Sequence, residues 1–206
     1  MKTSSDERIA RLTQSGMWGT DTLHDLLARN AAATPDREAV VDPANKLELM
    51  GEEPRRLSVA ELDSASSTCA RELASRGVEM GDRVILQLPN TSELLVLYYA
   101  LSKLGAVISP IAVQYGTHEL AHFRDELAPA ALITVSDLRG AKLAQQARAV
   151  FESSRVLDVT EDLNVYAGLN DDPTGNWAND ANATLTVAWT SGTTGMPKAV
   201  PRSHNM

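Results

Sequence analysis

A short run of glycine, serine and threonine that ends in a lysine is the part of this sequence best suited to chemistry. It occupies residues 190–198, Thr-Ser-Gly-Thr-Thr-Gly-Met-Pro-Lys, and follows an apolar run at residues 185–189. Glycine lets the backbone turn sharply and approach an anion closely, hydroxyl groups donate hydrogen bonds, and lysine adds a positive charge on a long stem. A loop of this composition is suited to holding a polyphosphate.

Two familiar phosphate-binding motifs do not fit this loop. The pattern G-x-x-x-x-G-K-[ST], counted from Gly192, places its second glycine at Pro197, and Lys198 is followed by Ala199 instead of Ser or Thr. The dinucleotide pattern G-x-G-x-x-G fails because the glycines here are spaced as G-x-x-G. Spacing therefore excludes both nucleotide-binding classes.

Composition indicates a soluble chain. The 206 residues carry a net charge of −8, from 19 basic and 27 acidic residues, which argues against a nucleic-acid-binding surface. Cys69 is the single cysteine, so no internal disulfide is possible, which fits the reducing cytoplasm. The first residues lack the apolar core of a signal peptide, and no apolar run reaches the roughly 18 residues that a membrane span requires. We expect a cytoplasmic protein without a membrane span.

Apolar periodicity predicts short strands that alternate with longer helices. The expected helices are residues 22–33, 58–76, 94–104, 117–127 and 138–151, with a marginal one at 162–168. The expected strands are residues 38–42, 82–88, 106–110, 130–135, 155–159 and 184–189. Three segments are predicted to be irregular: a weakly patterned leader at residues 1–20, an exposed hairpin or loop at 43–56, and a polar surface loop at 170–182.

This alternation predicts the α/β class, with a largely parallel sheet covered by helices on both faces. Ligands of such sheets bind beyond the carboxyl ends of the strands, and the loop at residues 190–198 directly follows a predicted strand.

The loop resembles the phosphate loop of the adenylate-forming (AMP-binding) superfamily, which includes acyl-CoA synthetases and aryl-AMP ligases. That signature is similar to [TS]-S-G-[TS]-T-G-x-P-K-G followed by [ST]-H, which residues 190–199 and Ser203-His204 reproduce, with Ala199 in place of the last glycine. Upstream segments also look like the family, namely residues 26–27, 34–40, 57–62, 81–84, 88–90, 103–106 and 109–110. Residues 201–205 look closest to the aryl-AMP ligases and related carboxylate–CoA ligases.

The resemblance implies an enzyme that uses ATP and Mg²⁺ to convert a carboxylic acid to an acyl-adenylate, and then transfers the acyl group to coenzyme A. It implies that Lys198 is an electrostatic partner of the ATP phosphates and that Gly192 and Gly195 allow the backbone to wrap around them. The implied hydrogen-bond donors to these phosphates are Thr190, Ser191, Thr193 and Thr194. His204 is a candidate for the substrate pocket.

The family fold is roughly twice as long as this chain or more. Its adenine-binding motif, ribose-binding aspartate, hinge and carboxy-terminal catalytic lysine have no counterpart here. We therefore expect residues 1–206 to be a partial amino-terminal AMP-binding domain without its carboxy-terminal domain, inactive alone. The alternative is a non-catalytic module that binds a nucleotide or a partner.

Residues 118–122, His-Glu-Leu-Ala-His, match the zinc-peptidase pattern H-E-x-x-H. A zinc hydrolase is a remote alternative, because a five-residue pattern arises often by chance and the sequence offers no apparent third ligand. No metal ligand is assigned, and Cys69 is expected in the core because it lies on the apolar stripe of its helix.

Overall fold

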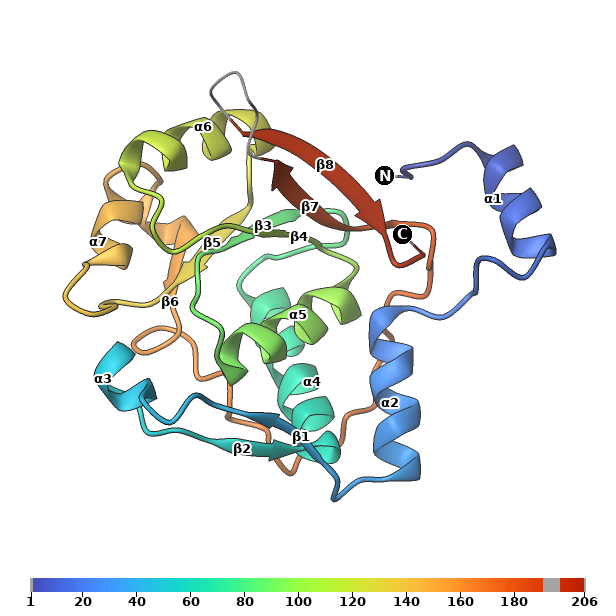
Figure 1. Ribbon diagram of the computed structural model, residues 1–206, viewed down its shortest axis with the longest axis horizontal. Helices are drawn as coiled ribbons and strands as arrows, with labels where there is room; N and C mark the ends of the chain where they lie inside the picture. The colour runs from blue at the N-terminus through green and yellow to red at the C-terminus, as the bar shows by residue number, and fades with distance from the viewer. Residues whose placement is uncertain (1, 191–196, 206) are drawn as a thin grey trace.

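The computed structural model describes residues 2–190 and 197–205 and is built around a six-stranded sheet (Figure 1). The strand order is β6-β5-β3-β4-β7-β8, and every neighbouring pair is parallel except β7 and β8, which are antiparallel. The strands are β3 (Arg83–Leu86), β4 (Val107–Pro110), β5 (Ala131–Thr134), β6 (Val156–Asp158), β7 (Thr184–Thr190) and β8 (Lys198–Ser203). The predicted, largely parallel sheet is confirmed.

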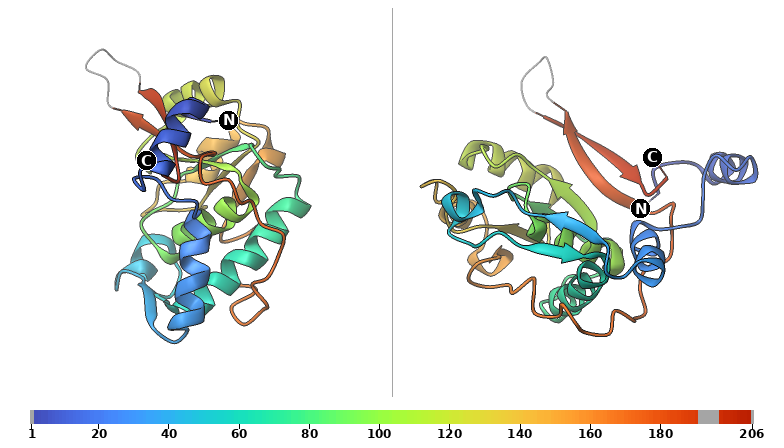
Figure 2. Two further views of the ribbon diagram at one scale, coloured as in Figure 1. Left: turned by 90° about the vertical axis from the view of Figure 1, so that its right-hand side faces the viewer. Right: turned by 60° about the horizontal axis from the view of Figure 1, so that its bottom comes forward.

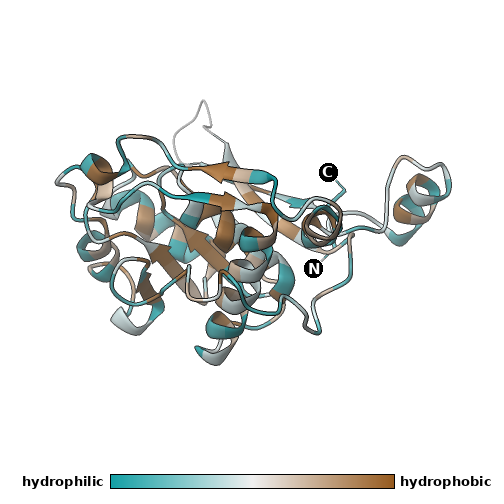
Figure 3. Ribbon diagram, turned by 90° about the horizontal axis from the view of Figure 1, so that it is seen from below, coloured by the Kyte–Doolittle hydropathy of each residue, from teal (hydrophilic) through white to brown (hydrophobic). Residues whose placement is uncertain are grey.

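Helices cover both faces of this sheet, as the sequence predicts. On β3, Val84 and Leu86 join the core that contains α4 (Val59–Ser75) and α5 (Ser92–Leu104), whereas Ile85 joins the core beneath α6 (Thr117–Leu127) and α7 (Leu143–Arg148). Successive strand residues point to opposite faces, so a fully apolar strand needs a helix layer on each side. Figure 3 shows these central strands mostly in the hydrophobic colour.

A small antiparallel sheet and one further helix flank α4. β1 (Glu38–Val41) pairs with β2 (Arg56–Ser58), and α2 (Leu23–Ala33) packs against α4 and α5. The predicted starts of α2 and α4 are confirmed. Ser58 and Glu61 form a reciprocal capping box at the start of α4, and Thr22 with Asp25 does the same for α2.

Four segments differ from the sequence expectation. Residues 6–14 of the leader form α1 (Asp6–Gln14), an amphipathic helix with no buried residue that lies apart from the body of the chain in Figure 1 and in the right view of Figure 2. The segment expected as an exposed loop contains α3 (Lys46–Met50), with Lys46 and Met50 buried. α7 begins only at Leu143, because the preceding turn uses positive φ at Arg139 and Gly140. Residues 162–168 form turns instead of a helix.

The polar segment at residues 170–182 has no regular structure but is fixed to α4. Arg71 donates to the carbonyl oxygens of Asp172 and Thr174, at 2.7 and 3.0 Å, and Ser67 donates to that of Pro173 at 2.8 Å. Its backbone is therefore paired by side chains of a helix, which is one of the ways in which loop carbonyls are satisfied. None of the described helices is long and apolar enough to span a membrane.

Candidate functional site

The predicted phosphate loop is framed by the β7–β8 hairpin. Thr190, the last residue of β7, pairs with Lys198, the first residue of β8, and both are exposed. The Thr190 hydroxyl lies 3.5 Å from the Lys198 carbonyl oxygen, which is at the long limit for a hydrogen bond. The other predicted loop residues, Ser191, Gly192, Thr193, Thr194 and Gly195, lie outside the described residues.

The hairpin lies where a parallel α/β sheet is expected to bind ligands. β7 runs parallel to β4, with Thr186 opposite Ile108, so its carboxyl end faces the same edge as the carboxyl ends of β3, β4 and β5. Crevices beyond that edge are the usual ligand sites of such sheets. The end of the hairpin at which β7 stops and β8 begins projects from the body of the molecule (Figure 2).

An aromatic cluster packs against the carboxyl end of β7. The Trp189 indole donates to the buried Ser109 hydroxyl of β4 over 2.8 Å, and its ring lies 4.5 Å from that of Phe123 on α6. Tyr115 packs edge-on against Phe123 with ring centroids 5.3 Å apart. Because an indole N–H usually needs a partner when it is enclosed, this bond fixes the rotamer of Trp189 beside the loop.

The residues of the H-E-x-x-H pattern have other roles. The Glu119 carboxylate accepts a hydrogen bond from the Gly116 amide at the start of α6, over 3.0 Å. His122 Nε2 lies 2.9 Å from the Pro197 carbonyl oxygen, and His118 is exposed. Across residues 2–190 and 197–205, no three His, Cys, Asp or Glu side chains are grouped so as to hold a metal. The arrangement gives the zinc-hydrolase alternative no support.

His204 lies at the opposite end of the hairpin from Lys198. Its neighbour Ser203 pairs with Thr184, at the start of β7, so about six residues of strand separate it from Lys198, roughly 20 Å at the rise of a β-strand. His204 Nδ1 accepts the Leu23 amide hydrogen at the start of α2, over 2.9 Å. Burial, with His24 nearby, lowers the pKa of His204 to about 4. The described residues therefore do not bring the two predicted site residues together.

The sequence matches the family described as AMP-binding enzyme over residues 27–206. The chain belongs to the AMP-binding enzyme family. It is 30% identical over 213 residues to salicyl-AMP ligase / salicyl-S-ArCP synthetase of Mycobacterium tuberculosis, covering 97% of this chain and 36% of that protein. It is 26% identical over 215 residues to the medium-chain fatty-acid–CoA ligase of Escherichia coli, covering 98% and 36%.

A solved structure agrees with this assignment. Apo MbtA of Mycobacterium smegmatis superposes with a TM-score of 0.78 at 30% identity, covering 98% of this chain and 37% of MbtA. The chain thus spans little more than a third of the length of the AMP-binding enzymes that it matches.

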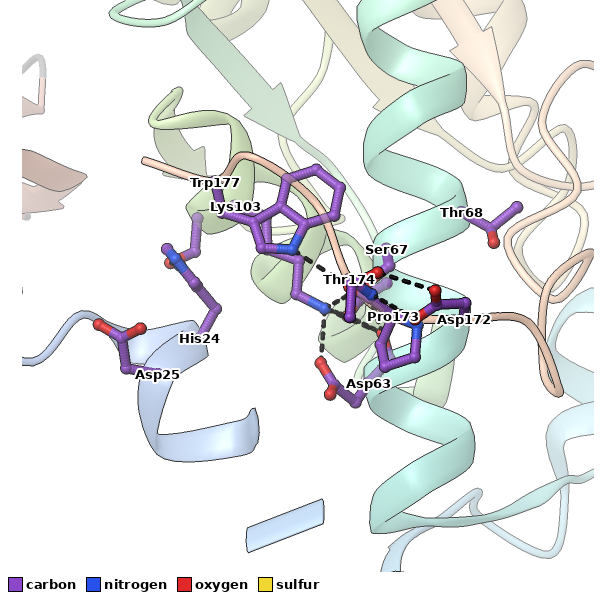
Figure 4. A network of polar contacts seen from close by, with 12 residues as sticks. His24, Asp25, Asp63, Ser67, Thr68, Lys103, Asp172, Pro173, Thr174 and Trp177 are labelled. Carbon is purple, nitrogen blue, oxygen red and sulfur yellow. Dashed lines mark hydrogen bonds and ion pairs between the residues drawn. The ribbon is translucent and has the colours of Figure 1, made fainter. Parts of the chain in front are cut away.

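Sequence reasoning missed a buried lysine between α4 and α5 (Figure 4). Lys103 Nζ donates to Asp63 Oδ1 and to Ser67 Oγ, each over 2.6 Å, and Trp177 lies over the ammonium with its centroid 5.7 Å away. Burial lowers the Lys103 pKa, and the Asp63 carboxylate opposes that shift. A cavity of about 390 Å³ adjoins this network, lined in part by His24, Asp25 and Trp177. The available signal was the position of Lys103, a charged residue within the mostly apolar helix predicted at residues 94–104.

A second buried lysine holds α3 in place. Lys46 is fully buried and donates to Asp42 over 2.8 Å, to Glu93, and to the Tyr166 hydroxyl over 3.3 Å. Burial beside Glu93 raises the Tyr166 pKa well above its usual value. Lys46 on α3, Asp42 directly after β1, Glu93 on α5 and Tyr166 after β6 all contribute, so the network ties together distant parts of the chain.

Proposed function

We propose that this chain carries the phosphate-binding hairpin of a ligase that uses ATP to activate a carboxylic acid as an acyl-adenylate. Family membership supports the class of reaction. The observation that carries the proposal is the pairing of Thr190 with Lys198 on either side of a Gly/Ser/Thr loop, at the carboxyl end of a strand parallel to β4. We call residues 190, 197 and 198 the hairpin neck.

The proposed chemistry accounts for the composition of the loop. A carboxylate oxygen attacks the α-phosphorus of ATP, the bond between that phosphorus and the bridging oxygen to the β-phosphate breaks, and pyrophosphate leaves with the electron pair. Negative charge grows on the β- and γ-phosphates as this happens, and preorganised donors aimed at that charge lower the barrier. In this proposal Lys198 supplies the positive charge. Hydroxyl or backbone donors come from Thr190, Ser191, Thr193 and Thr194, and the close wrap from Gly192 and Gly195.

Magnesium is proposed to arrive with the nucleotide. Proteins often hold Mg²⁺ with one or two carboxylates plus the phosphates of the substrate, and with several waters retained. The part of the chain that the structure describes offers no group of three His, Cys, Asp or Glu side chains for a metal, so we assign it no Mg²⁺ ligands and derive no step through the ion.

We propose an aryl acid as the substrate class and coenzyme A as the acceptor of the acyl group. The first rests on the similarity of residues 201–205 to aryl-AMP ligases and on the relative named salicyl-AMP ligase. The second rests on the relative named a fatty-acid–CoA ligase. A carrier protein is the alternative acceptor, because the name salicyl-S-ArCP synthetase specifies a carrier thioester for that relative.

Nucleotide binding tests the phosphate site directly. Titration of the 206-residue chain with ATP, followed by calorimetry, is expected to show binding that Lys198→Ala weakens about tenfold or more, the value of one charge-assisted hydrogen bond. Lys142→Ala is the matched control, because Lys142 is an exposed lysine paired with Asp137. Absence of ATP binding, or equal loss in both variants, would rule out the proposed site.

Turnover is a separate question. With ATP, Mg²⁺ and salicylate, benzoate or octanoate, we expect the 206-residue chain alone to release no pyrophosphate, because it spans little more than a third of its relatives. Acid-dependent pyrophosphate release would show instead that the chain is a competent adenylating enzyme by itself.

A further inference from the structure

One side chain outside the hairpin contacts β7 and also the residue that precedes β8. His122 lies on α6, partly buried, and its Nε2 is 2.9 Å from the carbonyl oxygen of Pro197, the residue directly before β8. Its ring also packs edge-on against Trp189 near the end of β7, with ring centroids 5.8 Å apart and planes at 61°. α6 therefore contacts β7 through an aromatic ring and the residue before β8 through a hydrogen bond.

The direction of this hydrogen bond follows from its partners. A carbonyl oxygen only accepts, so His122 must carry a proton on Nε2 and donate it to Pro197. Proline has no backbone N–H, so its carbonyl is the one backbone group through which Pro197 can be anchored by hydrogen bonding. The groups facing His122 are the Trp189 and Phe123 rings, with Asp125 close enough to interact electrostatically. The imidazole thus packs against two aromatic rings, tilted to one and edge-on to the other, while its N–H donates to Pro197.

Beside the backbone pairing of β7 with β8, two side chains contact the hairpin where the loop meets it, and their distances differ. The Thr190 hydroxyl approaches the Lys198 carbonyl only to 3.5 Å, whereas His122 reaches Pro197 at 2.9 Å, close to the optimum for an N–H···O bond. The shorter bond comes from a helix that is packed into the core through Leu120 and Phe123, both fully buried. A rigid support of this kind positions a functional side chain better than a contact within the loop itself.

We propose that His122 is a positioning residue for the phosphate site. By holding the Pro197 carbonyl, it sets the position of the backbone of Lys198, the next residue and the first of β8. This inference rests on the proposed function. The Lys198 ammonium is on a flexible four-carbon stem, so its reach to a phosphate depends on where its own backbone is held. Misplacement of a binding group by about 1 Å is enough to weaken a preorganised site severely.

Two substitutions of His122 distinguish the effect of its N–H donor from the effect of its aromatic ring. His122→Phe keeps an aromatic ring against Trp189 and removes the donor, whereas His122→Gln places an amide N–H near the position of Nε2. The matched control is His118→Phe, one turn earlier on the same helix at an exposed position. Equal free energies of unfolding for the three variants, from urea titration, identify effects that are local to the hairpin.

The rate of trypsin cleavage tests how firmly the hairpin neck is held when no nucleotide is present. Lys198 is the first basic residue after Arg155, so a cut there gives a distinct fragment. We expect His122→Phe to raise the rate of native-state cleavage after Lys198 up to about tenfold, the range set by one hydrogen bond, with His122→Gln restoring most of the protection. Cleavage in His122→Phe that is no faster than in His118→Phe would overturn the anchoring role.

ATP titration of the same proteins tests the link to the phosphate site. We expect His122→Phe to weaken ATP binding several-fold, and His122→Gln and His118→Phe to bind like the parent chain. If the parent binds ATP and His122→Phe binds equally well, the positioning role is refuted while the proposed function stands. If the parent does not bind ATP at all, the proposed function fails, and the positioning role fails with it.

Discussion

Lys103 Nζ donates a hydrogen bond to Asp63 Oδ1 over 2.6 Å inside the protein, where the two side chains are only 2% and 6% exposed. The Ser66 and Ser67 hydroxyls accept from the same ammonium, at 2.9 and 2.6 Å, so its donors are all engaged. Asp63 and both serines lie on α4 and Lys103 lies on α5. The pair therefore fixes the helix contact that covers one face of the sheet (Figure 4).

We expect Lys103→Met to destabilise the chain by about 3–5 kcal/mol, because it leaves the Asp63 carboxylate buried without a counter-ion. Urea titration measures this loss. The double variant Lys103→Met/Asp63→Leu is expected to recover most of it, since it removes both charges. Lys142→Met, which breaks an exposed pair with Asp137, should cost little, because solvent screens such pairs. A cost for Lys103→Met as small as that of Lys142→Met would contradict this account.

The sequence was sufficient where local pattern decides structure. Residues 58–61, Ser-Val-Ala-Glu, predict the start of α4 because a capping box involves only neighbouring residues. The apolar strands predict a doubly covered sheet, since a strand with no polar face must be buried on both sides. The loop at residues 190–198 predicted the family, because its residue types and spacing are specific to one kind of phosphate loop.

The sequence was insufficient where distant residues decide structure. Lys46 lies in a charged segment that predicts an exposed loop, yet it is fully buried, where it pairs with the nearby Asp42 and with Glu93, 47 residues away. The contact of His122 with Pro197 joins residues 75 apart, and no local pattern encodes it. His204 follows the family signature, and its contact with the Leu23 amide, 181 residues away, becomes visible only in the folded chain.

Gly168 should not tolerate a side chain. A Cβ at this position would lie 2.0 Å from Thr68 Oγ1 and 2.4 Å from Thr68 Cβ, on the helix to which residues 170–182 are fixed. We expect Gly168→Ala to cost about 1–3 kcal/mol, the usual range for overpacking. Gly19→Ala is the control, because its nearest neighbour would be 3.9 Å away. Denaturation curves that coincide for the two variants would show that the segment moves aside freely.

Ser58 and Thr91 offer a contrast between two helix N-caps. The Ser58 hydroxyl accepts from the Glu61 amide, so we expect Ser58→Ala to cost about 1 kcal/mol. Thr91 begins α5 without a capping hydrogen bond, and its hydroxyl is buried without a partner in the described part of the chain. Thr91→Ala should therefore cost clearly less than Ser58→Ala, because it removes an unsatisfied polar group. Thermal unfolding of both variants decides the order, and a larger loss for Thr91→Ala would contradict this interpretation.

His204 should make stability depend on pH. Its pKa is lowered to about 4 in the folded chain, by burial first and then by His24, and the positive end of the α2 dipole also disfavours a charged imidazole there. An unfolded histidine titrates near 6.5, so between pH 6.5 and 4 the unfolded chain binds the extra proton and stability falls as pH falls. Above pH 6.5 this contribution is complete, and below pH 4 it has been lost.

His204→Asn removes the titration while keeping an acceptor for the Leu23 amide, since the Asn side-chain oxygen occupies a position similar to Nδ1. We expect the variant to lose less stability than the parent between pH 6.5 and 4, by on the order of 1–2 kcal/mol once solvent screening of the partly exposed ring is allowed for. The pKa of His24 is also lowered by burial, so a smaller pH dependence of the same sign should remain in the variant. Urea titrations at half-unit steps of pH measure both slopes. Parallel curves for the two proteins across this window would mean that His204 carries its proton in the folded state and that its Nδ1 does not accept the Leu23 amide hydrogen.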